Sequence, residues 1–161
     1  MNANRHHGQR HPQKRLSAGT VVVRESEHGL LFLLLRAFKH WDFPKGMVED
    51  DETPFEAAQR ETQEESGISE LDFRWGDNFY ETPPYNRGKV ARYYLAHTLE
   101  EAISIVPNPV TGRLEHVEYR WVSFEQAWRM VSPRVQRVLS WAAIQLDLDS
   151  DGHAGNGETG E

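Results

Sequence analysis

Cysteine is absent from this chain of 161 residues. Its absence excludes disulfide bridges and thiolate metal sites. Long apolar runs are also missing, because no stretch approaches the roughly 20 residues that a membrane-spanning helix needs. The first residues lack the apolar segment of a secretion signal. These absences predict a cytoplasmic protein without a transmembrane helix or a membrane partner.

Positive charge is scarce as well. The chain has 18 Lys and Arg residues against 25 Asp and Glu residues, which gives a formal net charge of -7. General nucleic-acid binding needs a surface rich in Lys and Arg that displaces counterions from phosphates, so the composition argues against it. An acidic protein that acts on an acidic substrate needs cations from elsewhere, and bound metal ions are one source.

The two ends of the chain differ from its middle. Residues 1–15 carry basic and histidine side chains without apolar periodicity, and residues 148–161 are rich in Asp, Gly and Glu. Both segments are predicted to be disordered, the first as a basic leader and the second as an acidic tail. The remaining segment, residues 16–147, is about the size of one domain.

Apolar residues in this central segment follow the periods of both strands and helices. A hairpin turn is expected at residues 27–29. Strands are predicted over residues 21–24, 30–36, 71–80, 89–97 and 119–122. Helices are predicted over residues 54–66, 124–131 and 133–146. This order of elements predicts an α/β (α+β) fold in which helices pack on a mixed sheet.

The helix over residues 54–66 has clear signals at both ends. Thr53 is a good N-cap, Pro54 suits the first helical position, and Glu56 completes a capping box with Thr53. Gly67 provides the left-handed residue that commonly ends a helix. The sequence therefore bounds this helix on local grounds alone.

Three glutamates, Glu61, Glu64 and Glu65, fall at positions i, i+3 and i+4 of this helix and share one sector of its surface. Like charges at this spacing repel, and two of them lie in the last turn, where the helix dipole is already negative. Mg²⁺ and Mn²⁺ bind clustered carboxylate oxygens, so metal binding would account for the cluster. The small Ala57, one turn earlier, is expected to leave room for ions and substrate.

A second interpretation of the cluster needs no metal. Acidic runs are often solvated helix faces. Arg60 would support such a face by pairing with Glu64 at i, i+4. Helical spacing by itself leaves both interpretations open.

A longer pattern around this helix resembles a known family signature. Gly46, Glu52 and the run from Arg60 to Ile68 are similar to the Nudix box, G-x5-E-x7-R-E-U-x-E-E-x-G-U, in which U is a bulky aliphatic residue. Every fixed position matches, and Thr62 occupies one aliphatic slot. The resemblance implies the Nudix fold, an α/β/α sandwich with a mixed sheet.

The resemblance also implies roles for single residues. The metal ligands for Mg²⁺ or Mn²⁺ would be Glu61, Glu64 and Glu65, with the Gly46 carbonyl as a further one. The general base would be Glu61 or Glu115, which stay competing candidates. A buried ion pair between Glu52 and Arg60 would hold the loop of the box against the helix.

Outside the box, the chain is most similar to the asymmetric dinucleoside tetraphosphate hydrolases. The resemblance is carried by residues 41–46, 89–96 and 115–121. It implies hydrolysis of a dinucleoside tetraphosphate to a nucleoside triphosphate and a nucleoside monophosphate, with a small nucleotide as the partner. Lys45 and Lys89 are expected to hold phosphates, and Tyr85 is expected to stack on a base.

Two alternatives stay open. Residues 41–46 are also similar to bacterial enzymes that remove pyrophosphate from RNA 5′ ends, and Met47 and residues 50–51 depart from the dinucleotide branch. The first alternative is therefore a Nudix hydrolase that acts on RNA 5′ ends, on other nucleotides or on diphosphoinositol polyphosphates. RNA 5′ ends are the only nucleic-acid partner expected. The alternative from another class is a Nudix domain that senses a nucleotide without catalysis. The sequence carries no prediction of the oligomeric state.

Overall fold

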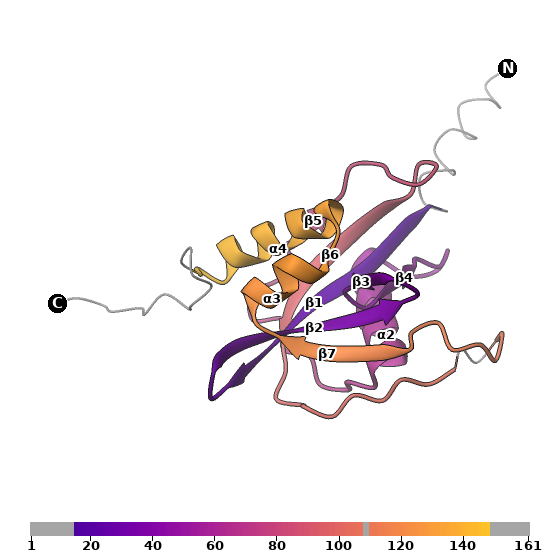
Figure 1. Ribbon diagram of the computed structural model, residues 1–161. Coiled ribbons are helices and arrows are strands. Elements are labelled where there is room, and N and C mark those ends of the chain that lie inside the picture. Colours follow the sequence, from indigo (N-terminus) through magenta and orange to yellow (C-terminus); the bar gives the residue numbers. More distant parts are fainter. Residues whose placement is uncertain (1–14, 108–109, 149–161) are drawn as a thin grey trace, which may run out of the picture.

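The computed structural model describes residues 15–107 and 110–148 (Figure 1). The predicted leader and tail therefore lie almost wholly outside the described residues. The two boundary residues that are described both contact the folded body: Arg15 donates a hydrogen bond to the Arg87 carbonyl, and Leu148 packs at the margin of the main core.

The described residues form a seven-stranded mixed sheet. Its strands are β1 (Leu16–Ser26), β2 (Gly29–Ala37), β3 (His40–Asp42), β4 (Lys45–Met47), β5 (Tyr80–Glu81), β6 (Val90–His97) and β7 (Glu118–Val122). The main order is β3-β2-β1-β6-β5, while β4 pairs with β1 and β7 pairs with β2. Only the β1 and β6 pair is parallel among these pairings of the described strands.

The predicted hairpin at residues 27–29 is confirmed. Ser26 lies opposite Gly29, and Gly29 has a φ of 97°, a left-handed conformation that favours glycine. β2 then runs between β1 and β7, which agrees with the continuous apolarity of residues 30–35.

Helices cover both faces of the sheet in Figure 1, with α2 (Pro54–Ser66) on one face and α3 (Phe124–Met130) and α4 (Pro133–Gln145) on the other. Alternation along β1 explains the two layers. Val21 and Val23 join the core under α3 and α4, whereas Val22 belongs to a cluster on the opposite face. The predicted α/β/α sandwich is confirmed. No helix of the described residues is both long and apolar enough to cross a bilayer.

Two parts of the sheet differ from the prediction. The strand predicted over residues 71–80 is wrong, because the Gly76 amide donates to the Phe73 carbonyl at 2.9 Å and turns the chain there. Only an isolated bridge between Asp72 and His97 precedes β5. The short strands β3 and β4 were not predicted, since three residues carry too little periodicity.

A close backbone approach brings β4 to β1. A Cβ atom on Gly19 would lie 2.2 Å from the Pro44 carbonyl oxygen and 2.5 Å from the Lys45 Cβ. Gly19 therefore allows β4 to pair with β1, and this pairing places the loop before α2 beside the helix.

Candidate active site

The helix α2 begins and ends as its sequence predicts. The Thr53 side chain accepts from the Glu56 amide, the Glu56 side chain accepts from the Thr53 amide, and Gly67 has a φ of 78°. Ala57 differs from its prediction. It is fully buried against Ala18 and Tyr94, so its small size serves close packing on the sheet and leaves no room for ions.

Thr62, the residue in the aliphatic slot of the box, is also fully buried. Its hydroxyl donates to the Ala58 carbonyl at 2.7 Å and lies 2.9 Å from the Thr20 hydroxyl of β1. A buried hydroxyl with these partners is satisfied. The threonine therefore keeps α2 attached to the sheet by hydrogen bonds where the family pattern uses apolar contact.

A cavity of about 320 Å³ lies between α2, β4 and two parts of the loop between β6 and β7, residues 105–107 and 115–116. It contains all four predicted metal ligands and both candidate bases. The residues that line it are Lys45, Gly46, Met47, Glu61, Glu64, Glu65, Ile105, Val106, Pro107, Glu115 and His116. We call it the acidic cavity.

Burial raises the pKa of two carboxyl groups of the acidic cavity. Burial raises the pKa of Glu65 to about 9, although its Oε2 accepts the Lys45 amide at 2.9 Å. Burial also raises the pKa of Glu61, against the opposing effect of the hydrogen bond from Arg60. A positive charge in the cavity would favour the ionised form of both groups.

The interpretation of the cluster as a solvated face explains only part of the geometry. The expected Arg60 and Glu64 pair forms at 3.2 Å, and the Glu64 side chain is 49% exposed. The Glu61 side chain, in contrast, is only 15% exposed, and Glu65 is half-buried. The cluster therefore faces the cavity more than the solvent.

In the described part of the chain, no three His, Asp or Glu side chains stand ready to hold one metal ion. The carboxyl groups of the acidic cavity bind other groups of this chain instead. Arg60 binds Glu61 at 2.8 Å as well as Glu64, and Glu65 binds the backbone of Lys45. The donor set itself, carboxylates beside a backbone carbonyl, fits the hard cations Mg²⁺ and Mn²⁺.

Gly46 leaves space that the Glu61 carboxyl fills. A Cβ atom on Gly46 would lie 2.1 Å from the carboxyl carbon of Glu61. Gly46→Ala is therefore expected to displace this flexible side chain, keep the fold, and lower kcat up to about 100-fold. Steady-state hydrolysis and thermal unfolding measure the two effects. The control is Gly76→Ala, which meets no atom within 4 Å but has a φ of 86°; it should lower the unfolding midpoint, because alanine is strained there, and leave kcat unchanged.

Arg60 connects the loop of the box to α2. Its guanidinium donates to Glu52 at 2.6 and 3.0 Å and to the Met47 carbonyl at 3.1 Å. The hydrogen bond from Arg60 lowers the pKa of Glu52. The Glu52 side chain is 12% exposed and the Arg60 side chain 27%, so the pair is shielded from water on most sides.

A second cavity, of about 850 Å³, adjoins the acidic cavity and shares Lys45, Gly46, Met47 and His116 with it. We call it the basic cavity. It contains all three residues predicted to bind substrate, Lys45, Lys89 and Tyr85. Most of its other lining side chains come from residues 35–43 and 130–134.

Tyr85 and Lys89 are presented together by a tight turn. Their backbones exchange two hydrogen bonds, of 2.9 and 2.8 Å. Between them Asn86, Arg87 and Gly88 all have positive φ values of 40, 69 and 88°. Paired residues of this kind lie on the same side of a ladder, so the turn places an aromatic ring beside an ammonium group.

Three site residues were missed by sequence reasoning: Asp42, His116 and Arg134. His116 lines both cavities, and burial lowers its pKa; its position beside Glu115 was a signal that could have found it. Arg134 donates to Asp42 at 3.1 Å across 92 residues of sequence. No local pattern could have indicated that contact.

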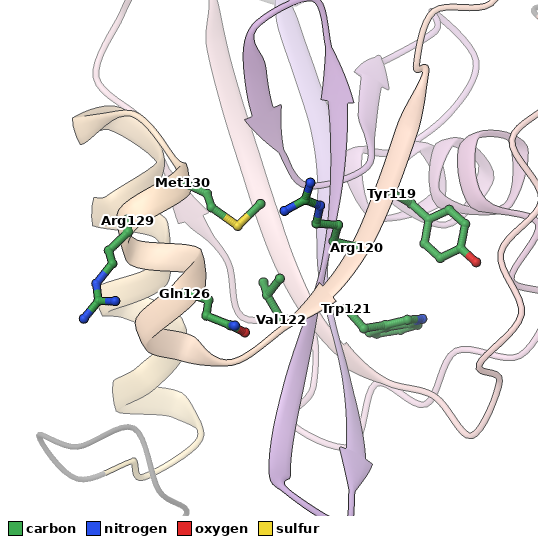
Figure 2. A pocket seen from close by; sticks show the side chains of 7 residues that line it. All are labelled: Tyr119, Arg120, Trp121, Val122, Gln126, Arg129 and Met130. Carbon is green, nitrogen blue, oxygen red and sulfur yellow. The ribbon is translucent and has the colours of Figure 1, made fainter.

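A third hollow, of about 620 Å³, lies between β7 and α3 (Figure 2). None of the predicted site residues lines it; its lining residues are Tyr119, Arg120, Trp121, Val122, Gln126, Arg129 and Met130. Arg120 lies 5.3 Å from the ring centre of Trp41, which lines the basic cavity. This contact joins the wall of the third hollow to the candidate site.

Comparisons with known proteins agree with this geometry. The NUDIX domain family matches residues 13–142. The bis(5′-nucleosyl)-tetraphosphatase [asymmetrical] of Caenorhabditis elegans is 32% identical over 117 residues, which cover 69% of this chain and 80% of that protein. An RNA pyrophosphohydrolase of Vibrio vulnificus is 39% identical over 61 residues, 37% of this chain and 34% of that protein.

A solved structure is similar to this chain as well. The crystal structure of a C. elegans Ap4A hydrolase binary complex has a TM-score of 0.69 and 27% sequence identity, and it covers 81% of this chain and 98% of its own. The domain match covers more than half of the chain, and the C. elegans relative exceeds 30% identity over more than two thirds of both proteins. The chain therefore belongs to the Nudix family.

Proposed function

We propose that this chain is a Nudix hydrolase that cleaves dinucleoside tetraphosphates asymmetrically, to a nucleoside triphosphate and a nucleoside monophosphate. The observation that carries the proposal is the sharing of Lys45, Gly46 and His116 between the acidic and the basic cavity. A phosphoanhydride at this junction has carboxylates on one side and cations with an aromatic ring on the other.

The basic cavity suits a nucleotide in size and chemistry. Its volume of about 850 Å³ falls in the usual range for small-molecule sites, roughly 300–1,000 Å³. Lys45 and Lys89 would hold phosphates that are remote from the reacting bond. Tyr85 would stack on a base.

The acidic cavity would hold the metal. Nudix hydrolases in general need divalent metal ions, and we propose Mg²⁺ or Mn²⁺, held by the Gly46 carbonyl and by Glu61, Glu64 and Glu65. Once bound, such an ion neutralises phosphate charge and lowers the pKa of a coordinated water.

One carboxylate of this chain then takes the proton of the attacking water, a contribution of about 10²- to 10⁴-fold in rate. Glu61 and Glu115 both line the acidic cavity and remain the two candidates. They come from different elements, since Glu61 lies on α2 and Glu115 lies in the loop before β7. Arg60 donates a hydrogen bond to the Glu61 carboxyl and so orients this candidate.

The extent of the two matches favours dinucleotides over RNA ends. The C. elegans relative is matched over 80% of its length, and the Vibrio relative over 34%. The sensor alternative is disfavoured because all three glutamates of the box are present and line one cavity.

Purified protein incubated with Mg²⁺ and diadenosine tetraphosphate is expected to yield ATP and AMP in equal amounts, as resolved by ion-exchange chromatography. A chelator should abolish turnover, and added Mg²⁺ or Mn²⁺ should restore it. Two ADP molecules per substrate, or intact substrate, would contradict the proposal. Rates on triphosphorylated RNA, diphosphoinositol polyphosphates and nucleoside triphosphates should be lower, and a clear preference for RNA would favour the alternative.

A further inference from the structure

We propose that Arg134 is a positioning residue, which holds the Tyr85 ring as a stacking surface for a nucleobase. This inference rests on the proposed function. Its central observation is that the Arg134 guanidinium carbon lies 4.2 Å from the centre of the Tyr85 ring. Both side chains line the basic cavity.

Arg134 is itself held firmly. It lies in the first turn of α4, where Ser132 caps the helix. One guanidinium nitrogen donates to the Tyr93 hydroxyl at 3.0 Å, and the other donates to Asp42 at 3.1 Å. Tyr93 is fully buried and donates to the other Asp42 oxygen at 3.0 Å. The guanidinium is thus fixed in its plane by groups of two other elements, Asp42 of β3 and Tyr93 of β6.

Tyr85 needs such a support. It lies in a loop next to Asn86 and Arg87, which both have positive φ values, and it is only half-buried at the margin of the core. A guanidinium over one face of a ring restricts the ring through a cation–π contact. In this arrangement the base would stack on the second face, and the ring would not have to be ordered when the substrate binds.

Arg134 also balances the charge beside the phosphate site. The Lys45 ammonium lies 4.0 Å from the Asp42 oxygen that accepts from Arg134. Because Asp42 already has a cationic partner in Arg134, Lys45 stays available for phosphate. A substitution of Arg134 that keeps the positive charge therefore removes the support of the Tyr85 ring and preserves the cation beside Asp42.

Arg134→Lys is that substitution, since lysine keeps a cation near Asp42 and loses the planar fork. The expected result is a KM for diadenosine tetraphosphate raised about tenfold with kcat within about twofold. Inhibition by inorganic tripolyphosphate, which has no base, should be unchanged. Arg137→Lys, on the exposed side of the same helix, is the matched control and should behave as the wild type.

A double-mutant cycle with Tyr85→Leu tests whether Arg134 acts through the ring. In the Tyr85→Leu background, Arg134→Lys should change KM no further. Equal additional loss in that background, weaker inhibition by tripolyphosphate, or an unchanged KM in the single variant would each overturn the inference. A merely structural role would lower the unfolding midpoint and kcat instead.

The outcome is distinguishable from failure of the proposed function. If the wild type leaves diadenosine tetraphosphate intact, the proposed function fails, and AMP binding measured by calorimetry still tests Arg134. A Kd about tenfold weaker for Arg134→Lys than for the wild type supports the inference. Equal affinities, or no AMP binding by the wild type, overturn it.

Discussion

Glu64→Gln should lower kcat for diadenosine tetraphosphate by a factor on the order of 1,000, which is about 4 kcal/mol of transition-state stabilisation. The substitution removes one proposed metal ligand and keeps the shape of the side chain. Stability should hardly change, because Glu64 is 49% exposed and its ion pair with Arg60 is worth only a few tenths of a kcal/mol at a surface. Steady-state kinetics and urea unfolding measure the two quantities.

The matched control is Glu56→Gln on the same helix. Glu56 completes the capping box, and glutamine serves equally well at that position, so both activity and stability should stay near the wild-type values. Near-normal turnover of the Glu64→Gln variant would remove the basis of the metal hypothesis and revive the interpretation of the cluster as a solvated face.

Arg60→Met should lower the free energy of unfolding by about 3 kcal/mol, the lower end of the range for breaking a buried ion pair. The lower end applies because the Arg60 side chain is 27% exposed. The loss leaves Glu52 and Glu61 without their cation and frees the Met47 carbonyl. Urea unfolding measures the change.

Arg129→Met provides the comparison for that experiment. Arg129 pairs with Glu125 at 3.7 Å, and both side chains are more than 70% exposed, so its loss should cost less than about 1 kcal/mol. Equal effects of the two substitutions would show that the Arg60 cluster contributes no more than a surface pair, and the structural role of Glu52 and Arg60 would have to be abandoned.

Local signals predicted the helix that carries the proposed metal ligands. The cap at Thr53, the stop at Gly67 and the spacing of the glutamates all act within a few residues. The hairpin at residues 27–29 was predictable for the same reason. Ala57 shows the limit of such reasoning, because position on a helix wheel did not reveal that the sheet lies directly against it.

Contacts between residues far apart in the sequence could not be predicted from local patterns. The residues that order the basic cavity come from β3, β6 and α4, and the contact between Asp42 and Arg134 spans 92 residues. The strand predicted over residues 71–80 failed because a turn at Gly76 overrode the local β pattern. β3 and β4, which carry Asp42 and Lys45, were too short to leave a periodic signal.

The turn between Tyr85 and Lys89 separates substrate binding from bond cleavage, so that one property can change without the other. The proposed metal ligands belong to α2 and β4, and the candidate base Glu115 lies in the loop before β7. The Tyr85 ring and the Lys89 ammonium are instead placed by three residues with positive φ between them. Lengthening or shortening that turn would part the ring from the ammonium without disturbing a single carboxylate of the helix. Under the proposed function, small insertions and deletions in this turn would change which substrate binds and leave the reaction itself unchanged.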